Sequence, residues 1–191
     1  WMALRSAGLY CSVGDFYIDP HRPVARALIT HAHADHARAG HGCVWATAQT
    51  IDVMKIRYGD NCAKNFVPVD YSSKWDLGSV GVTFFPAGHI LGSAQILLCY
   101  AGIRLVITGD FKRQLDPTCV PFEVVPADCL ITEATFGLPV FRHPPIQQEL
   151  QKLLDSLASH PKSTHLLGCY ALGKAQRVIM GLRALGYQET I

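Results

Sequence analysis

Four side chains that commonly bind metal ions lie within one short segment near the N-terminus. The segment reads H-x-H-x-D-H and contains His31, His33, Asp35 and His36. Three protonated imidazoles this close together would repel one another, whereas a divalent cation binds neutral His together with charged Asp. In an extended chain, residues two apart point the same way, so His31 and His33 can share one ion. The next two ligands lie further along and can reach a second ion.

Three later segments repeat the pattern in which an apolar run leads to a polar residue. The apolar run over residues 24–29 precedes the first motif, and the runs over 80–85, 104–109 and 129–132 lead to His89, Asp110 and Glu133. Binding sites of layered α/β folds are commonly built from the loops at strand ends. We therefore expect four buried strands that present these side chains at one rim of the fold.

The ligands form two sets that share one carboxylate. Site one takes His31, His33, His89 and Asp110, and site two takes Asp35, His36 and the other oxygen of Asp110. A bridging carboxylate can hold two ions about 3.5–4 Å apart, a spacing that suits hydrolysis. Ligands from His and Asp without Cys favour Zn²⁺, with Mn²⁺ or Fe as alternatives. We therefore expect two divalent metal ions as cofactors.

The rest of the sequence predicts an α/β organisation. Near residue 142 the pattern of apolar residues changes, which indicates a second unit. The spacing of Ile51, Met54 and Tyr58 predicts a helix over 47–58, and the apolar runs on either side of Ala101-Gly102 predict a β-hairpin. After Pro145 the sequence predicts a helix, a strand over 164–170 and a helix over 173–185. We expect a catalytic domain over residues 1–141 and a separate unit over 142–191.

Composition is typical of a folded globular protein. The chain is 49% hydrophobic and 17% charged, and it contains neither an apolar run of membrane-spanning length nor a signal-peptide pattern. Seven scattered Cys without a C-x-x-C pair predict buried, reduced thiols in a cytosolic protein and argue against Cys ligation of zinc. A net charge of +2 is compatible with a nucleic-acid partner but is too small to establish one.

Together these motifs resemble the metallo-β-lactamase fold. The resemblance is carried by H-x-H-x-D-H, the G-H loop at His89 and the T-G-D turn at Asp110, and Glu133 in T-E-A-T-F-G resembles the acidic motif of β-CASP nucleases. More narrowly, residues 8–11, 33–40 and 133–144 resemble the bacterial ligase-associated DNA exonucleases. The resemblance implies an αββα sandwich, with its N-terminal half in residues 1–141 and the start of a truncated β-CASP cap domain in 142–191.

The resemblance also implies a function, namely metal-dependent hydrolysis of nucleic-acid phosphodiester bonds. In the narrower form this is a DNA exonuclease of DNA repair in the bacterial cytoplasm, with a DNA ligase and a helicase as partners. Asp35 would orient the attacking water, and Glu133 would hold a His located after residue 191. Because the chain begins with Trp1 and ends shortly after a helix stop, we expect a fragment of a longer protein. Alone it would hold about one ion tightly and be weakly active or inactive.

The sequence says less about which residues contact the substrate, and about which substrate this is, than about the metal ligands. Lys112 and Arg113 follow Asp110 and are either phosphate contacts or part of a solvated turn. The stretch 168–175 nearly matches a P-loop, but Ala175 replaces the Mg²⁺-binding Ser/Thr, which favours a contact of Lys174 with a substrate phosphate. An RNA 3′-end-processing nuclease, a thioester hydrolase of the same fold and an inactive metal-binding fragment are left open, although Glu133 and the start of a cap argue against the thioesterase.

Overall fold

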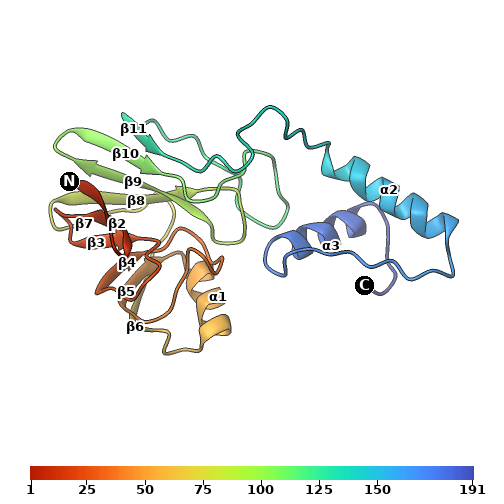
Figure 1. Cartoon of the computed structure of the whole chain (residues 1–191), viewed down its shortest axis with the longest axis horizontal. Helices are drawn as coiled ribbons and strands as arrows, with labels where there is room; N and C mark the ends of the chain where they lie inside the picture. The colour runs from red at the N-terminus through yellow and green to blue at the C-terminus, as the bar shows by residue number, and fades with distance from the viewer. The chain divides into compact units, whose positions relative to one another are not determined.

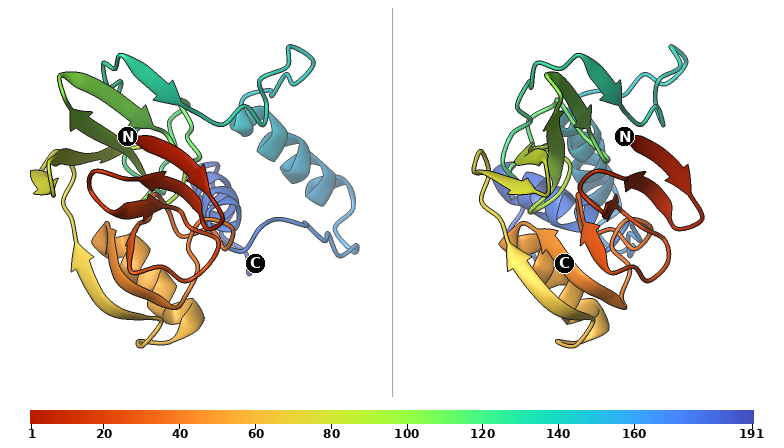
Figure 2. Two further views of the ribbon diagram at one scale, coloured as in Figure 1. Left: turned by 60° about the vertical axis from the view of Figure 1, so that its left-hand side comes forward. Right: turned by 90° about the vertical axis from the view of Figure 1, so that its left-hand side faces the viewer.

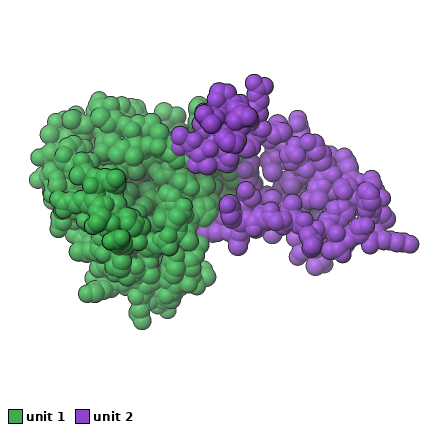
Figure 3. Space-filling model, in the orientation of Figure 1, with its two compact units in different colours: residues 1–133 green, residues 134–191 purple.

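The computed structural model describes residues 1–191 and divides the chain into two compact units. The first comprises residues 1–133 and the second residues 134–191 (Figure 3). The division follows Glu133, whereas the sequence pattern placed the change near residue 142. That the second unit is the start of a cap domain stays a prediction. None of the helices is long and apolar enough to cross a membrane.

The first unit contains two β-sheets (Figure 1). The six-stranded sheet has the order β1 (Met2–Arg5), β2 (Gly8–Cys11), β3 (Phe16–Ile18), β4 (Arg26–Leu28), β5 (His41–Ala46) and β6 (Ala63–Pro68). The five-stranded sheet has the order β11 (Cys129–Ile131), β10 (Ile103–Ile107), β9 (Ala94–Tyr100), β8 (Val80–Pro86) and β7 (Lys74–Leu77). This two-sheet, mixed α/β architecture confirms the fold class that the motifs predicted.

Each face of the six-stranded sheet packs against a different layer because successive side chains of a strand point to opposite sides. Leu28 joins a core cluster with Phe84 and Ile96 of the other sheet, whereas its neighbour Ala27 joins a cluster with Met54. Met54 belongs to α1 (Ala48–Tyr58), which confirms the helix predicted over 47–58 and has Thr47 as its N-cap. The unit is therefore layered as helix, sheet and sheet (Figure 2).

The polar residues that follow three strands of the five-stranded sheet lie at the same edge, because these strands run in the same direction. β8 and β10 are both antiparallel to β9, and β10 is parallel to β11, so these three strands finish at the same edge of their sheet. The β9–β10 hairpin turns at Ala101 and Gly102, which both have positive φ (50° and 79°), as a two-residue type I′ turn requires. The predicted hairpin and the positions of the four strands expected before the ligand residues are thus confirmed, with β4 shorter than the apolar run that contains it. The expectation that all four are buried is wrong for β11, whose three residues are exposed at the edge of the sheet.

The second unit consists of two helices and an extended connection. α2 (Ile146–Ser159) and α3 (Lys174–Ala184) pack where Gly181 leaves room for Leu150, since a Cβ on Gly181 would lie 2.3 Å from Cδ1 of Leu150. Both predicted helices are confirmed. The predicted strand over 164–170 is wrong, because the segment has no hydrogen-bonded neighbouring strand and Leu166 is 93% exposed. An apolar run forms a strand only where a partner satisfies its backbone.

The cysteines are all free, but the expectation that they are buried is only partly correct. Cys11 and Cys62 are buried, whereas Cys129 and Cys169 are exposed. Cys129 lies in the apolar run that forms β11, and this strand is an edge of the five-stranded sheet with every residue exposed. An apolar run therefore predicted the strand correctly but did not predict its position in the sheet.

Candidate metal centre

Four of the proposed ligands converge where β4, β8 and β10 end. One ligand atom from each of His31, His33, His89 and Asp110 can be chosen so that all four lie within 4.8 Å of one another. Nδ1 of His33 lies 3.0 Å from Nε2 of His31 and 3.1 Å from Nε2 of His89. Oδ2 of Asp110 lies 3.7 Å from Nε2 of His31 and 3.5 Å from Nε2 of His89. These are the four residues that the sequence assigned to site one.

The spacing of these atoms matches the donor set of a divalent cation. Four atoms held tetrahedrally at about 2.0–2.1 Å from a zinc ion lie about 3.3 Å from one another. The four separations given above, 3.0–3.7 Å, bracket that value, and all four atoms lie within 4.8 Å of one another. Three imidazole nitrogens and one carboxylate oxygen form a set that suits Zn²⁺. The residues present therefore fit a bound metal ion at this point.

Asp110 also faces the proposed second set of ligands with its other oxygen. Oδ1 of Asp110 lies 3.3 Å from Nε2 of His36, and the same nitrogen lies 3.7 Å from Oδ2 of Asp35. The two oxygens of Asp110 thus point to different imidazole groups, as a bridging carboxylate requires. The Asp35 side chain is 76% exposed, which leaves it accessible to water and to a substrate.

Asp19 and Thr30 form a supporting network that sequence reasoning missed. Oδ2 of Asp19 accepts hydrogen bonds from Nδ1 of His36 (2.8 Å) and from the Thr30 hydroxyl (2.6 Å), and Oδ1 accepts one from the Thr30 backbone N–H (2.8 Å). Because the Thr30 hydroxyl gives its hydrogen to Asp19, its oxygen can accept the Nδ1 hydrogen of His31, 3.1 Å away. Both imidazoles therefore direct Nε2 toward the ligand group.

A signal for Asp19 was present in the sequence. The residue directly follows the apolar strand β3, which is parallel to β4, so it lies at the same edge of the sheet as the first ligand motif. The strand-end pattern that identified Asp110 and Glu133 therefore applies to the run over 16–18 as well. The run is only three residues long, which is why it gave no clear strand pattern.

Burial and neighbouring charges set the pKa values of the ligand group. Burial, followed by repulsion from His36 and His89, lowers the pKa of His31 to about 2 and keeps its imidazole neutral. Burial opposes protonation of His36, but hydrogen bonds with Asp110 and Asp19 outweigh it and raise the pKa to about 10. The hydrogen bond from His36 lowers the pKa of Asp110 to about 2. The carboxylates around His36 thus attract positive charge, which a proton or a metal ion can supply.

The loop that carries His89 is held by Ser93 and Tyr71. The Ser93 hydroxyl oxygen accepts hydrogen bonds from the backbone N–H groups of His89 (3.0 Å) and Ile90 (3.2 Å). The Ser93 carbonyl accepts from the Ala87 N–H (3.1 Å) and from the Tyr71 hydroxyl (2.9 Å). One buried serine therefore closes the turn on both sides of the His89 ligand.

The loop that carries Asp110 passes close to the first motif. A Cβ on Gly109, whose φ is +54°, would lie 2.6 Å from the Thr30 hydroxyl oxygen, so only glycine fits here. Beyond Asp110, the Phe111 N–H donates to Oε1 of Glu133 over 3.3 Å. Glu133 therefore fixes the backbone next to the bridging carboxylate.

A pocket of about 300 Å³ opens beside the second ligand set. Its polar lining includes Asp19, Asp35, His36, Asp110 and Glu133. Its apolar wall comes from Leu9, Ile18, Ile107 and Ile131. Both carboxylates to which the sequence assigned catalytic roles, Asp35 and Glu133, thus line one pocket with the bridging aspartate.

The three cationic side chains proposed to contact the substrate differ in their ion pairing and in the unit to which they belong. The Lys112 ammonium pairs with the buried carboxylate of Asp116, so much of its charge is neutralised. Arg113 is exposed on the same loop. Lys174 lies in the second unit, at the start of α3, with its ammonium 5.1 Å from the centre of the Tyr170 ring. The structure does not bring these three cations together within one unit.

Comparisons with known proteins agree with this geometry. A crystal structure of a protein of unknown function from Enterococcus faecalis has the same fold, with a TM-score of 0.55, 14% identity, and coverage of 86% of this chain and 45% of that chain. No protein-family model matches the chain. A probable DNA ligase of Opitutus terrae is 33% identical over 187 residues, which is 95% of this chain and 18% of the relative. Endoribonuclease ysh1 of Aspergillus fumigatus is 34% identical over 143 residues, which is 70% of this chain and 16% of the relative.

The chain belongs to the metallo-β-lactamase fold family, in its β-CASP branch. It spans between 16% and 18% of the length of these two relatives. The metallo-β-lactamase fold explains why the ligands are so far apart in the sequence, since His33 and His89 come from strands of different sheets whose ends meet at one edge.

Proposed function

We propose that this protein hydrolyses phosphodiester bonds of nucleic acid with the help of two divalent metal ions, and that its substrate is DNA. The observation that carries the proposal is the position of Asp110, whose two oxygens face the imidazoles of His31 and His36. Two adjacent cation sites joined by a carboxylate suit in-line displacement at phosphorus. The narrower form of the proposal is a DNA exonuclease that acts in bacterial repair together with a ligase and a helicase.

His31, His33, His89 and Asp110 would hold the first ion, and Asp35, His36 and Asp110 would contribute to the second. When bound, such ions lower the pKa of a coordinated water and polarise the phosphate. The exposed carboxylate of Asp35 orients the attacking water by accepting one of its hydrogens. Glu133 and Asp19 touch the ligand segments and hold them in place. Zn²⁺ is the proposed metal and Mn²⁺ the alternative.

An RNA substrate is the second candidate, and a specific observation favours it. The relatives include a fungal endoribonuclease that is 34% identical over 70% of this chain. The similarity to a probable DNA ligase extends further, over 95% of this chain, and supports DNA. The ligand group itself does not distinguish the two sugars, because its residues would contact the phosphate.

The decisive experiment uses the full-length protein and compares its cleavage of one sequence presented as single-stranded DNA, duplex DNA and RNA, with the metal content measured in parallel. We expect cleavage of DNA that stops on chelation and returns with added metal. The His33→Ala variant should lose cleavage and largely retain nucleic-acid binding, because His33 lies between the other two imidazoles of site one. Preferential cleavage of RNA would favour the second candidate, and full turnover by His33→Ala would refute the two-metal mechanism.

A further inference from the structure

A second pocket, of about 340 Å³, lies between the two sheets of the first unit and takes no part in the proposed metal centre. Two indole rings, an apolar wall and two polar residues line it, and they include Trp45, Val67, Pro68, Asp70, Ser73 and Trp75. Its volume is near the lower limit of about 300–1,000 Å³ for small-molecule sites, so it suits one ring system better than a whole nucleotide. We call it the indole pocket.

The indole pocket lies toward the end of the sheets at which the metal ligands gather. β4, β5 and β6 are parallel, so Trp45 and Val67, near the C-terminal ends of β5 and β6, lie toward the edge where His31 follows β4. Neighbouring strands are about 4.8 Å apart, which places β6 about 10 Å from β4. The Trp45 carbonyl accepts the Ile29 N–H over 2.9 Å, just before the first ligand motif.

The segment over residues 70–73 joins the indole pocket to the loop of His89. The Tyr71 hydroxyl donates to the Ser93 carbonyl over 2.9 Å, and the Ser93 hydroxyl oxygen accepts the His89 backbone N–H over 3.0 Å. Through Trp45 on one side and Tyr71 on the other, the pocket therefore adjoins both segments that carry the histidines of site one.

The two indoles give the pocket a flat apolar surface. Trp45 belongs to the six-stranded sheet, and Trp75 belongs to the five-stranded sheet. Nε1 of Trp75 is buried without a hydrogen-bond partner, so this ring turns carbon atoms rather than its N–H group to the pocket. Stacking on aromatic side chains is a main source of affinity for single-stranded nucleic acid, and it accepts any base. The rings alone therefore favour a base without selecting which one.

Asp70 supplies a polar group that distinguishes the bases. Its side chain is exposed and forms neither an ion pair nor a hydrogen bond within the chain. A carboxylate only accepts hydrogen bonds, and its two oxygens suit two adjacent N–H donors. Guanine has two such donors side by side, its N1–H and its N2 amino group. Adenine and cytosine have a ring acceptor next to the amino group, and thymine has a carbonyl on each side of its N–H, so each brings a lone pair against the carboxylate.

Arg26 argues against a cationic ligand in the indole pocket. Its guanidinium carbon lies 5.6 Å from the centre of the Trp45 ring, and its Nη1 donates to the Gly14 carbonyl over 3.0 Å rather than to a carboxylate. A positively charged ligand would be attracted by Asp70 but repelled by Arg26. A neutral planar group with two N–H donors meets no such repulsion.

We propose that the indole pocket binds a guanine base of the substrate strand, with the Asp70 carboxylate accepting from N1–H and from the N2 amino group. The inference rests on the proposed function and gives it a base preference. A nucleotide close to the scissile phosphate has to place its base only about 10 Å from β4 to reach β6. The protein should therefore bind and cleave strands with a guanine near the scissile bond more readily than strands without one.

The test measures base preference without turnover. The full-length protein, in the presence of a chelator, is titrated with oligothymidylate strands that carry one guanine, one hypoxanthine or one adenine, and tryptophan fluorescence reports binding. Because the phosphates are the same in all three strands, any difference in affinity comes from the base. We expect the guanine strand to bind on the order of tenfold more tightly than the adenine strand. Hypoxanthine, which lacks the N2 amino group, should lie between them.

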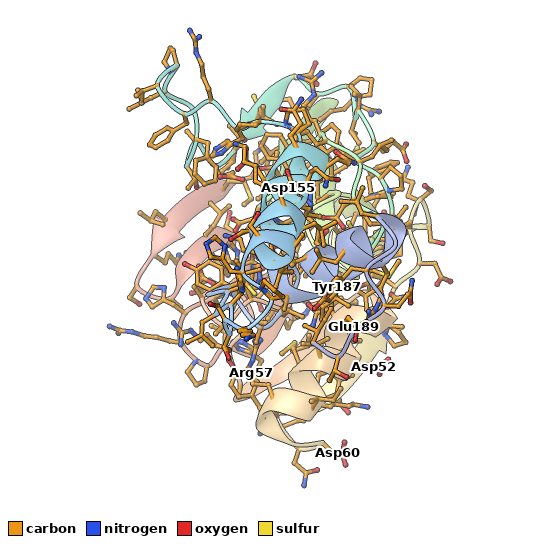
Figure 4. All side chains as sticks on the ribbon, turned by 90° about the vertical axis from the view of Figure 1, so that its right-hand side faces the viewer. Asp52, Arg57, Asp60, Asp155, Tyr187 and Glu189 are labelled. Carbon is orange, nitrogen blue, oxygen red and sulfur yellow. The ribbon has the colours of Figure 1, made fainter.

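Variants assign this preference to the pocket. Asp70→Asn should abolish it and leave the affinity for the adenine strand nearly unchanged, since the amide replaces one acceptor with a donor. Trp75→Leu should weaken binding of all three strands, and Trp75→Phe, which keeps a ring, should weaken it less. The matched control is Asp52→Asn, because Asp52 is an exposed carboxylate of α1 (Figure 4), which packs on the opposite face of the six-stranded sheet from Trp45. This control should keep the full preference for guanine.

The outcomes separate this inference from the proposed function. Equal affinity for the guanine and adenine strands, or a preference that survives Asp70→Asn, would overturn the inference. A guanine preference that depends on Asp70, without cleavage of DNA or RNA by the full-length protein, would support the indole pocket and reject the proposed function. Cleavage without any preference for guanine would do the reverse.

Discussion

Nδ1 of His36 lies 2.8 Å from Oδ2 of Asp19, a residue seventeen positions earlier in the chain. The same oxygen accepts the Thr30 hydroxyl hydrogen, and Thr30 in turn accepts from His31. Through these bonds one carboxylate orients an imidazole of each proposed metal site. Asp19 therefore supports one imidazole of each ligand set, in addition to Asp110, whose two oxygens face both sets.

We predict that Asp19→Asn weakens metal binding by about 10–100-fold, the range found when partners of metal-binding His are removed. The amide has only one oxygen, so either the Thr30 N–H or both His36 and the Thr30 hydroxyl lose their acceptor, and the support of His31 and His36 weakens. Titration calorimetry with Zn²⁺ measures the effect. Asp15→Asn is the control, because Asp15 has a similar positive φ but accepts from Tyr10, away from the ligands. Equal zinc affinities for the two variants would contradict the role of Asp19.

Gly109→Ala should distort the ligand group through Thr30. The new Cβ would lie 2.6 Å from the Thr30 hydroxyl oxygen, in addition to the strain of an alanine at a φ of +54°. Gly102→Ala separates the two effects, because Gly102 has a φ of +79° and a Cβ placed on it would meet no atom within 4 Å. We expect Gly102→Ala to cost about 1–2 kcal/mol of unfolding free energy. Gly109→Ala should cost about 1–3 kcal/mol more and also lower metal affinity.

Urea unfolding and metal titration of both glycine variants check this prediction. If Gly109→Ala and Gly102→Ala were equally stable and bound metal equally well, the close approach of the Asp110 loop to Thr30 would have no consequence. A loss of stability in Gly109→Ala without a loss of metal affinity would show that Thr30 adjusts without moving His31.

Ser93→Ala should weaken the site at its His89 ligand. The variant leaves the N–H groups of His89 and Ile90 without their acceptor, and an unpaired buried donor costs about 1–3 kcal/mol. Tyr71→Phe removes only the hydrogen bond to the Ser93 carbonyl and should have a smaller effect. Ser159→Ala, whose hydroxyl donates to a carbonyl on exposed α2, is the control. A Co²⁺ absorption spectrum of the ligand group should change in the order Ser93→Ala, Tyr71→Phe, Ser159→Ala, and any other order would contradict it.

Much of the fold could be predicted because its signals are local. The hairpin at Ala101-Gly102, the helix expected over 47–58 and the apolar runs before His89 and Asp110 each depend on a few neighbouring residues. The strand expected over 164–170 failed for the opposite reason. Whether an extended apolar segment becomes a strand depends on a neighbour from elsewhere in the chain, which sequence periodicity does not reveal.

In the candidate site, too, features that depend on neighbouring residues could be predicted, whereas contacts between distant segments could not. The ligand types and their grouping were readable because His and Asp follow apolar runs in recognisable motifs. The supporting contacts of Asp19, Ser93 and Tyr71 were not, since each depends on how segments meet in space. The ion pair between Lys112 and Asp116 is a further example, because spacing alone did not show that this lysine is neutralised.

Stability of the metal-free protein should fall as the pH drops below about 6.5, and His41 should contribute to this. The imidazole is fully buried, its Nδ1 accepts the Val24 N–H over 3.3 Å, and burial lowers its pKa. Above the unfolded-state value both states are neutral and the residue adds no pH dependence. Below that value the unfolded chain binds a proton that the folded protein does not, so the free energy of unfolding declines toward the lower folded pKa.

His41→Gln removes this titration, so the difference between the two proteins separates the contribution of His41 from those of the histidines in the ligand group. With a chelator present, urea unfolding between pH 7 and pH 5 should show a shallower decline for His41→Gln, by up to about 1.4 kcal/mol per pH unit. The variant should be less stable than the parent at pH 7, since it disturbs the contact with Val24, and the gap should narrow as the pH falls. Parallel curves for the two proteins would mean that His41 is protonated equally easily in the folded and unfolded states.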